Sequence, residues 1–219
     1  LATCLQQAAR WHDWGKAHQV FQDAVLDEGR PVPWKGRRVV AKAPGRRLDQ
    51  QGKVVDRGFW RRYGRKHFRH ELASALGVLH PDALGTADDD RALLDFFKST
   101  GLLSSEPDAA SWQAARDLMG YLIAAHHGKV RMSIRSLPNE TKPRDKRFAR
   151  GVWDGDVLPQ TDLGGGVVAP EVRLSLEPME LGLCELPPFA GQPSWLERML
   201  RLRDTLGPFH LAFLEALLR

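Results

Sequence analysis

The chain has 219 residues, of which 42% are hydrophobic and 27% charged, as in an ordinary globular protein with a substantial core. It contains no run of about eighteen apolar residues and its first residues turn polar at once, so we expect neither a membrane span nor a signal peptide. Two cysteines, Cys4 and Cys184, are too few for a disulfide framework or a paired-cysteine zinc site. These features favour a reducing, cytoplasmic location.

The net charge of +5 is unevenly distributed along the chain. Residues 30–70 contain fourteen Lys and Arg against two Asp and Glu, and residues 128–150 contain eight against two. Two basic blocks in an otherwise acidic protein indicate a polyanionic partner. The alternative interpretation is a pair of solvated loops whose charge only aids solubility.

Sequence patterns predict helices over much of the N-terminal half. A first helix is expected over residues 1–13 and a short second one over residues 17–29. Residues 30–58 are rich in Arg, Lys, Gly and Pro and contain two valine pairs, which is typical of a loose β-hairpin insertion. Apolar side chains at helical spacing predict further helices over residues 66–80 and 88–101.

The clearest helical pattern covers residues 111–128, where an apolar stripe runs from a capping serine to a terminal glycine. Residues 129–193 form an irregular segment, with a possible strand pair between residues 172–176 and 179–183.

The last part of the chain returns to helical patterns. Ser194 and Glu197 fit a capping box that opens a helix over residues 194–207, and a last helix follows over residues 208–219. Together the patterns predict a mainly α fold in a single domain, with a basic insertion at residues 30–65 and a second insertion formed by the irregular segment.

Four of the eight histidines, with one aspartate, lie at helix ends or on apolar helices. They are His12 and Asp13 in WHDWGK, His70 in FRHELAS, and His126 and His127 in AAHHGK. Neutral imidazole and carboxylate groups are ligands of transition metals, and the negative end of a helix dipole favours a cation. The joint occurrence predicts a metal site, although a lone His on an apolar helix, as at His70, is more often a satisfied core residue.

Helix geometry limits how these residues can share ions. Neighbours on a helix point about 100° apart, so we expect His126 and His127 to flank two metal ions instead of sharing one. Asp13 can bridge such a pair through its two oxygens while His12 binds one member. Lys16 can stabilise phosphate charge, or it is an ordinary solvated lysine.

The segments HDWGKAHQVFQ, RHELAS and AAHHG, in this order, resemble the HD nuclease domain of the CRISPR-associated helicase-nuclease of type I systems. The resemblance covers residues 9–128 and implies an HD-domain helical bundle with basic loop and β-hairpin insertions. The matching residues are His12, Asp13, Gly15, Lys16, Phe21, Gln22, His70, Glu71, Ser74, His126 and His127.

In that family a further histidine ligand precedes the HD motif and an aspartate ligand follows the last helix. Neither position falls within residues 1–219, and Asp204 stands too early to replace the aspartate, so we expect truncation at both ends.

The resemblance implies metal-dependent endonuclease or exonuclease cleavage of single-stranded DNA in CRISPR interference. A histidine-rich shell favours one or two Mn, Fe, Co or Ni ions over Mg, which prefers oxygen ligands. Ser74 and Glu71 would support the ligands, although Glu71 is equally compatible with a surface position. The implied ligands are His12, Asp13, His70, His126 and His127, with Asp13 and Lys16 as catalytic residues.

The first basic block falls between two ligand motifs and the second directly follows the last of them, so folding should bring both to the rim of the metal site. Interleaved aromatics such as Trp34 and Tyr63 suit single-strand binding by stacking and charge, or they pack the insertion onto the core. The other four histidines are expected to be structural or on the surface. The expected nucleic-acid contacts are Arg37, Arg38, Arg46, Arg47, Arg61, Arg62, Lys129 and Arg131.

The sequence contains no GxxxxGK[ST] phosphate loop, so an ATP-driven helicase must belong to another domain or chain. The implied partners are single-stranded DNA, that helicase and the RNA-guided surveillance complex, with no membrane. Two alternatives stay open: an HD phosphohydrolase that acts on nucleotides, and a non-catalytic module with an incomplete metal site that docks on nucleic acid or on the effector complex.

Overall fold

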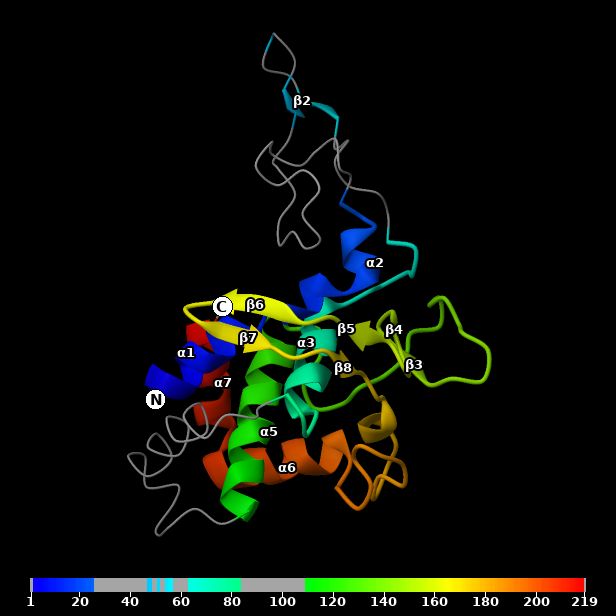
Figure 1. Cartoon of the computed structure of the whole chain (residues 1–219). Coiled ribbons are helices and arrows are strands. Elements are labelled where there is room, and N and C mark those ends of the chain that lie inside the picture. The colour runs from blue at the N-terminus through cyan, green and yellow to red at the C-terminus, as the bar shows by residue number, and fades with distance from the viewer. Residues whose placement is uncertain are drawn as a thin grey trace.

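The computed structural model describes residues 2–25, 47–48, 51, 54–56, 63–83 and 109–218. Within these ranges helices build the core, and the strands form only short pairs (Figure 1). The mainly α class predicted from the sequence is therefore confirmed for this part of the chain. No helix in the described ranges combines the length and the apolar character that a membrane crossing needs.

Helix α5 (Ala109–Ala125) lies at the centre of the helical core. It contacts α1 (Ala2–Trp11), α3 (His70–Leu79), α6 (Trp195–Leu206) and α7 (Pro208–Leu218). These neighbours bury the apolar stripe that the sequence predicts for this helix. The end of α5 consequently has a fixed place beside α1 and α3.

The segment after α1 is more broken than its sequence predicts. It forms a 3-10 turn, η1 (Trp14–Ala17), and a single helical turn, α2 (Gln19–Gln22). His18 is extended between them, so no continuous helix forms over residues 17–25. Residues 26–29, and the helix predicted over residues 88–101, lie outside the described residues.

Helix α3 begins at His70, four residues later than predicted. The backbone of His67 is left-handed, with φ of 63°, and Arg69 is extended. The Arg69 N–H donates to the Arg150 carbonyl at 2.8 Å. Residues 66–69 therefore run against a distant segment before the helix starts.

The basic insertion contains a short hairpin. Strand β1 (Arg47–Leu48) pairs antiparallel with β2 (Val54–Asp56), so one of the two valine pairs lies in a strand, as predicted. Its partner is not the other valine pair, which lies outside the described residues.

The irregular segment contains three antiparallel strand pairs. The predicted pairing of residues 172–176 with 179–183 is wrong, because Val172–Arg173 pairs elsewhere and Glu177–Met179 forms the 3-10 turn η4. The pairs are β3 (Phe148–Ala149) with β4 (Val152–Trp153), β5 (Val157–Leu158) with β8 (Val172–Arg173), and β6 (Thr161–Gly164) with β7 (Val167–Ala169).

The start of α6 confirms half of the predicted capping box. The Ser194 hydroxyl accepts from the Glu197 N–H at 3.3 Å. The Ser194 N–H instead donates to the Gly182 carbonyl at 2.8 Å, which ties the preceding loop to the helix. Gly207, with φ of 80°, ends α6 as expected.

Candidate metal centre

The five residues predicted as ligands meet at the junction of α1, η1, α3 and the turn after α5. His70, His126 and His127 form one group, and His12, Asp13 and His126 form a second group. In each group, one potential ligand atom from every residue lies within 4.8 Å of the others. The arrangement can hold a metal ion, and the shared His126 links the two groups.

His126 and His127 lie beyond the last residue of α5, in a turn that Gly128 closes with φ of 67°. Their ring centroids are 4.0 Å apart, and the ring of His70 is 5.1 Å from that of His127. The expectation that the pair cannot face one ion assumes regular helix geometry. It does not hold here, because the helix ends at Ala125.

Backbone carbonyls determine which imidazole nitrogen can bind a metal. Nδ1 of His12 lies 2.6 Å from the Ala9 carbonyl oxygen, and Nδ1 of His126 lies 2.6 Å from that of Ile123. A carbonyl oxygen only accepts, so each Nδ1 carries the proton and each Nε2 keeps its lone pair. Nε2 of His126 is buried and forms no hydrogen bond within the described structure, whereas the buried Nε2 of His70 faces the Asp13 carboxylate.

Burial keeps two of these imidazoles neutral. It lowers the pKa of His126 to about 4, and the neighbouring histidines act in the same direction. Partial desolvation of the more exposed His127 ring, together with the nearby His70, also lowers the pKa of His127. At neutral pH both rings are therefore in the form that binds metal, without first losing a proton.

Asp13 directs one oxygen to the histidines and the other to a lysine. Its Oδ1 lies 3.4 Å from Nε2 of His12 and 3.3 Å from Nε2 of His70, whereas Oδ2 accepts from Lys16 Nζ at 2.6 Å. Partial burial would raise the pKa of Asp13, but His70 and Lys16 hold it below its usual value. Lys16 thus orients the carboxylate, and a bridge through both oxygens requires Lys16 to move.

Two small residues, Gly15 and Ser74, let residues 12–15, which we name the HD turn, pack against α3. The Ser74 hydroxyl accepts from the Gly15 N–H at 2.6 Å and donates to the His12 carbonyl at 2.8 Å. A Cβ at Gly15 would lie 2.0 Å from the His70 carbonyl oxygen, so no larger residue fits. The sequence indicates a supporting role for Ser74, but it gives no sign of this close approach at Gly15.

Glu71 lies behind the candidate ligand His70 instead of on the surface. Glu71 is fully buried, and its Oε2 lies 3.6 Å from Nδ1 of His70. Oε1 lies 3.9 Å from Nε of Arg69, and neither oxygen has a hydrogen bond within the described structure. The carboxylate can therefore orient the His70 ring from the side away from the centre.

The other four histidines lie outside the two groups. His18 is buried, and its Nε2 lies 3.0 Å from Asp156. His67 and His210 are exposed, and His80 is buried at the far end of α3. These positions agree with the structural or surface roles expected for them.

The predicted nucleic-acid residues are only partly described. Lys129 is exposed, whereas Arg131 forms an ion pair with Glu215 at 2.6 Å. Tyr63 is half-buried against Phe21 and Phe68, as expected for an aromatic that packs the insertion onto the core. Arg47 lies in β1, and nothing is described of its side chain; outside the described residues are Arg37, Arg38, Arg46, Arg61 and Arg62.

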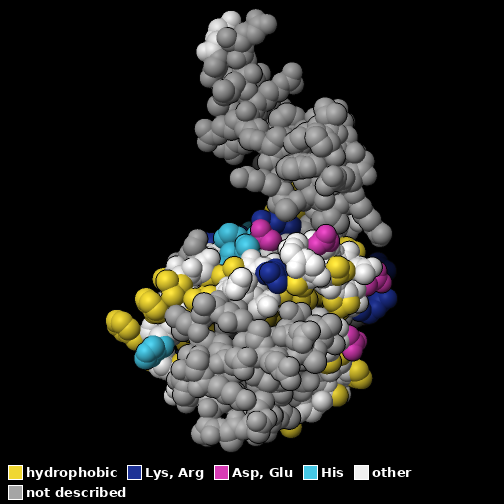
Figure 2. Space-filling model, turned by 60° about the vertical axis from the view of Figure 1, so that its left-hand side comes forward, with side chains coloured by type: hydrophobic (Ala, Val, Ile, Leu, Met, Phe, Trp, Pro, Cys, Tyr) yellow, Lys and Arg dark blue, Asp and Glu magenta, His cyan; other side chains and the backbone are white. Residues whose placement is uncertain are grey.

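The candidate metal centre is open to solvent on one side. The side chains of His12 and Asp13 are each 33% exposed, and His127 is exposed. Figure 2 shows histidine side chains gathered beside an acidic one on the molecular surface. A large substrate can therefore reach the centre.

Neither the protein-family models, nor the curated proteins, nor the solved structures contain a match for this chain. Function is therefore argued below from the geometry of the five residues and from the resemblance of their sequence motifs.

Proposed function

We propose that this protein is a metal-dependent nuclease of the HD type, which hydrolyses phosphodiester bonds of single-stranded DNA. The observation that supports it is the convergence of His12, Asp13, His70, His126 and His127 from separate segments, with the buried Nε2 of His126 left without a hydrogen-bond partner. Such an arrangement costs stability unless it has a ligand, because buried polar atoms without partners are destabilising.

The donor set fits a transition metal better than magnesium. Four imidazoles and one carboxylate suit Mn, Fe, Co or Ni, whereas Mg favours oxygen ligands. One or two bound ions would polarise the phosphate and lower the pKa of a bound water.

The chain's own residues orient the reacting groups. The carbonyls of Ala9 and Ile123 hold the rings of His12 and His126 in one tautomer. Lys16 is 22% exposed, so its Nζ can donate to a phosphate oxygen when a strand enters, while it remains next to Asp13. This position supports the proposed catalytic role of Lys16, because one lysine can both orient Asp13 and contact the phosphate.

Cleavage assays test the proposal. Wild-type protein with Mn²⁺ should degrade a linear single strand, and a circular one reveals whether cleavage is endonucleolytic. Asp13→Ala and His126→Ala should lower the rate roughly a hundredfold or more, since loss of a mere supporting partner already costs 10- to 100-fold. His67→Ala, which changes an exposed histidine near His70, should retain full activity.

Two results would contradict the proposal. One is cleavage that is unchanged in both ligand variants. The other is hydrolysis of nucleotides without cleavage of DNA, which would favour the phosphohydrolase alternative. The partner helicase, the surveillance complex and the cytoplasmic location remain predictions from the sequence resemblance and composition.

A further inference from the structure

Backbone contacts join the two basic blocks of the sequence beside the metal centre. The Arg69 N–H donates to the Arg150 carbonyl at 2.8 Å, directly before the ligand His70. The Lys66 N–H donates to the Thr141 hydroxyl at 3.3 Å. Segments far apart in the chain thus form one continuous surface that begins at a metal ligand.

A glycine allows this contact to be close. Gly151 has φ of 73°, and a Cβ there would lie 2.5 Å from the Phe68 Cα. Glu140 holds the same turn, because its carboxylate accepts from the Arg150 N–H at 2.9 Å. The joined segments are consequently fixed by backbone geometry, independently of the long basic side chains.

The basic side chains on this surface have no acidic partners. We name Lys66, Lys142, Arg144 and Lys146 the basic surface; all four are exposed. None of them forms an ion pair with any residue that the structure describes. Asp145 is the one acidic residue between 141 and 150, so the surface keeps a strong positive charge.

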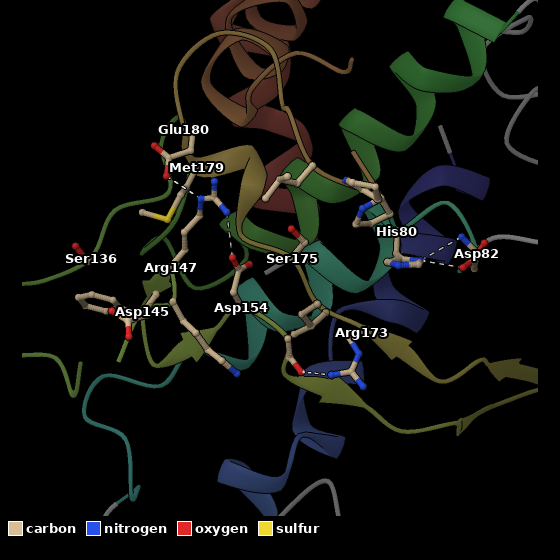
Figure 3. A pocket seen from close by; sticks show the side chains of 17 residues that line it. His80, Asp82, Ser136, Asp145, Arg147, Asp154, Arg173, Ser175, Met179 and Glu180 are labelled. Carbon is tan, nitrogen blue, oxygen red and sulfur yellow. Dashed lines mark hydrogen bonds and ion pairs between the residues drawn. The ribbon is translucent and has the colours of Figure 1, made fainter. Parts of the chain in front are cut away.

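The far end of the basic surface borders a pocket of about 1000 Å³ (Figure 3). A Cβ at Gly155 would lie 3.7 Å from Lys146 Nζ and 3.8 Å from Arg173 Nη1, so two cations converge on one point. Arg147, also at this pocket, is neutralised by acidic neighbours such as Glu180. The unpaired charge therefore lies at Lys146 and Arg173.

The distance to the metal centre is short. Lys146 precedes Arg150 by four residues, which span at most about 14 Å when extended. Arg150 contacts the residue next to His70. A flexible polyanion seated on the basic surface can therefore also reach the ligands.

We propose that the basic surface binds the phosphate backbone of a single-stranded nucleic acid that enters the metal centre, an inference that rests on the proposed nuclease function. A row of unpaired cations continuous with a phosphodiester-cleaving site fits a strand better than an acidic protein does. The nearby aromatics are covered, since Arg65 lies 3.7 Å over the ring of Trp153 and Tyr63 packs inward. Binding is therefore charge-driven and independent of base sequence.

A matched pair of double variants tests this surface. Lys142→Gln with Lys146→Gln removes two charges from it, and Arg201→Gln with Arg203→Gln removes two exposed charges from α6. Both variants have the same net charge. Binding of a labelled single-stranded DNA oligonucleotide is measured in EDTA, to prevent cleavage, over a series of salt concentrations.

The surface variant should flatten the log–log salt dependence of binding by roughly 1.4, or 0.7 for each lost phosphate contact. The α6 variant should keep the wild-type slope. An unchanged slope in the surface variant, or the same change in both variants, would overturn the inference. Equal binding of poly-glutamate that depends on the same two lysines would assign the surface to an acidic protein and also overturn it.

Failure of the surface and failure of the nuclease proposal give different results. If the surface variant alone loses DNA binding while the wild-type protein shows no cleavage with Mn²⁺, the surface stands and the nuclease proposal fails. Binding of an RNA oligonucleotide of the same length shows whether the basic surface distinguishes ribose from deoxyribose. Mn²⁺ binding by the surface variant should equal that of the wild type, because no ligand is changed.

Discussion

Three of the five candidate ligands depend on a neighbour in the sequence that fixes their position. His12 and His126 depend on backbone carbonyls, and Asp13 depends on Lys16. These contacts are local in sequence, within three residues, so they form as soon as the helix ends form. What brings the candidate ligands together is instead the packing of η1 and of α5 against α3.

Gly15→Ala tests the contact of η1 with α3. The added Cβ would clash with the His70 carbonyl, so we expect a loss of at least about 2 kcal/mol in the free energy of unfolding, and weaker metal binding. Gly64→Ala is the control, since nothing lies within 4 Å of its added Cβ, and it should be neutral or stabilise by up to about 1 kcal/mol. Equal stability of the two variants, measured by urea unfolding, would refute the close approach.

Ser74→Ala tests whether the Ser74 hydroxyl orients the HD turn, without adding any steric clash there. It removes the hydroxyl that joins Gly15 and His12 but leaves space for the glycine, so metal affinity should fall 10- to 100-fold. Calorimetric titration with Mn²⁺ measures the affinity, and Ser136→Ala, at an exposed serine, is the control. Wild-type affinity in the Ser74 variant would show that the HD turn is held by other contacts.

The ionisation of Asp156 should make the free energy of unfolding depend on pH. Burial would raise its pKa, but His18 and Arg65 lower it below the usual value. A carboxyl with a depressed folded pKa stabilises the fold above its unfolded pKa of about 3.9, and this stabilisation is lost as the pH falls through the folded value. Asp156→Asn should therefore be less stable than wild type at pH 7, and the difference should shrink below about pH 4. Urea unfolding at pH 7 and pH 3 measures it, and a constant difference would contradict the pKa shift.

At the scale of elements, apolar spacing predicted the helices that form the core, and glycine and serine predicted several of their ends. Ser194 and Gly207 bound α6 as predicted. Helix α5 instead begins at Ala109, so Ser111 lies inside the helix and does not cap it, and α5 ends three residues before Gly128. In two other places where the prediction was wrong, a contact distant in sequence decides the structure. α3 starts late because Arg69 bonds to Arg150, and Val172–Arg173 pairs with β5 instead of the segment that follows it.

The Ser194 cap gives a prediction at this scale. Ser194→Ala removes the hydroxyl that accepts from the Glu197 N–H, so α6 should lose about 1 kcal/mol of stability. Thr205→Ala, at an exposed position on the same helix, should change stability by less than about 0.5 kcal/mol. Chemical denaturation of both variants measures the difference, and equal values would show that the cap is energetically irrelevant.

At the scale of the whole molecule, the sequence predicted the five candidate ligands that the structure brings together, but it did not predict their arrangement. Helix periodicity separates His126 from His127, and only the early end of α5 lets them face one point. The sequence predicts that both basic blocks lie at the rim of the metal site, but it does not predict that residues 66–69 adjoin residues 141–150, because the contacts that join them are made largely by the backbone. The basic surface is thus a property of the folded chain and not of either block alone.

Equilibrium dialysis against Mn²⁺ with elemental analysis tests most directly whether the histidine cluster binds a transition metal. Wild-type protein should retain one or two ions per chain, His126→Ala should lose binding, and His210→Ala, at an exposed histidine outside the centre, should bind as the wild type does. Equal binding by the wild type and His126→Ala, or none by either protein, would contradict the account.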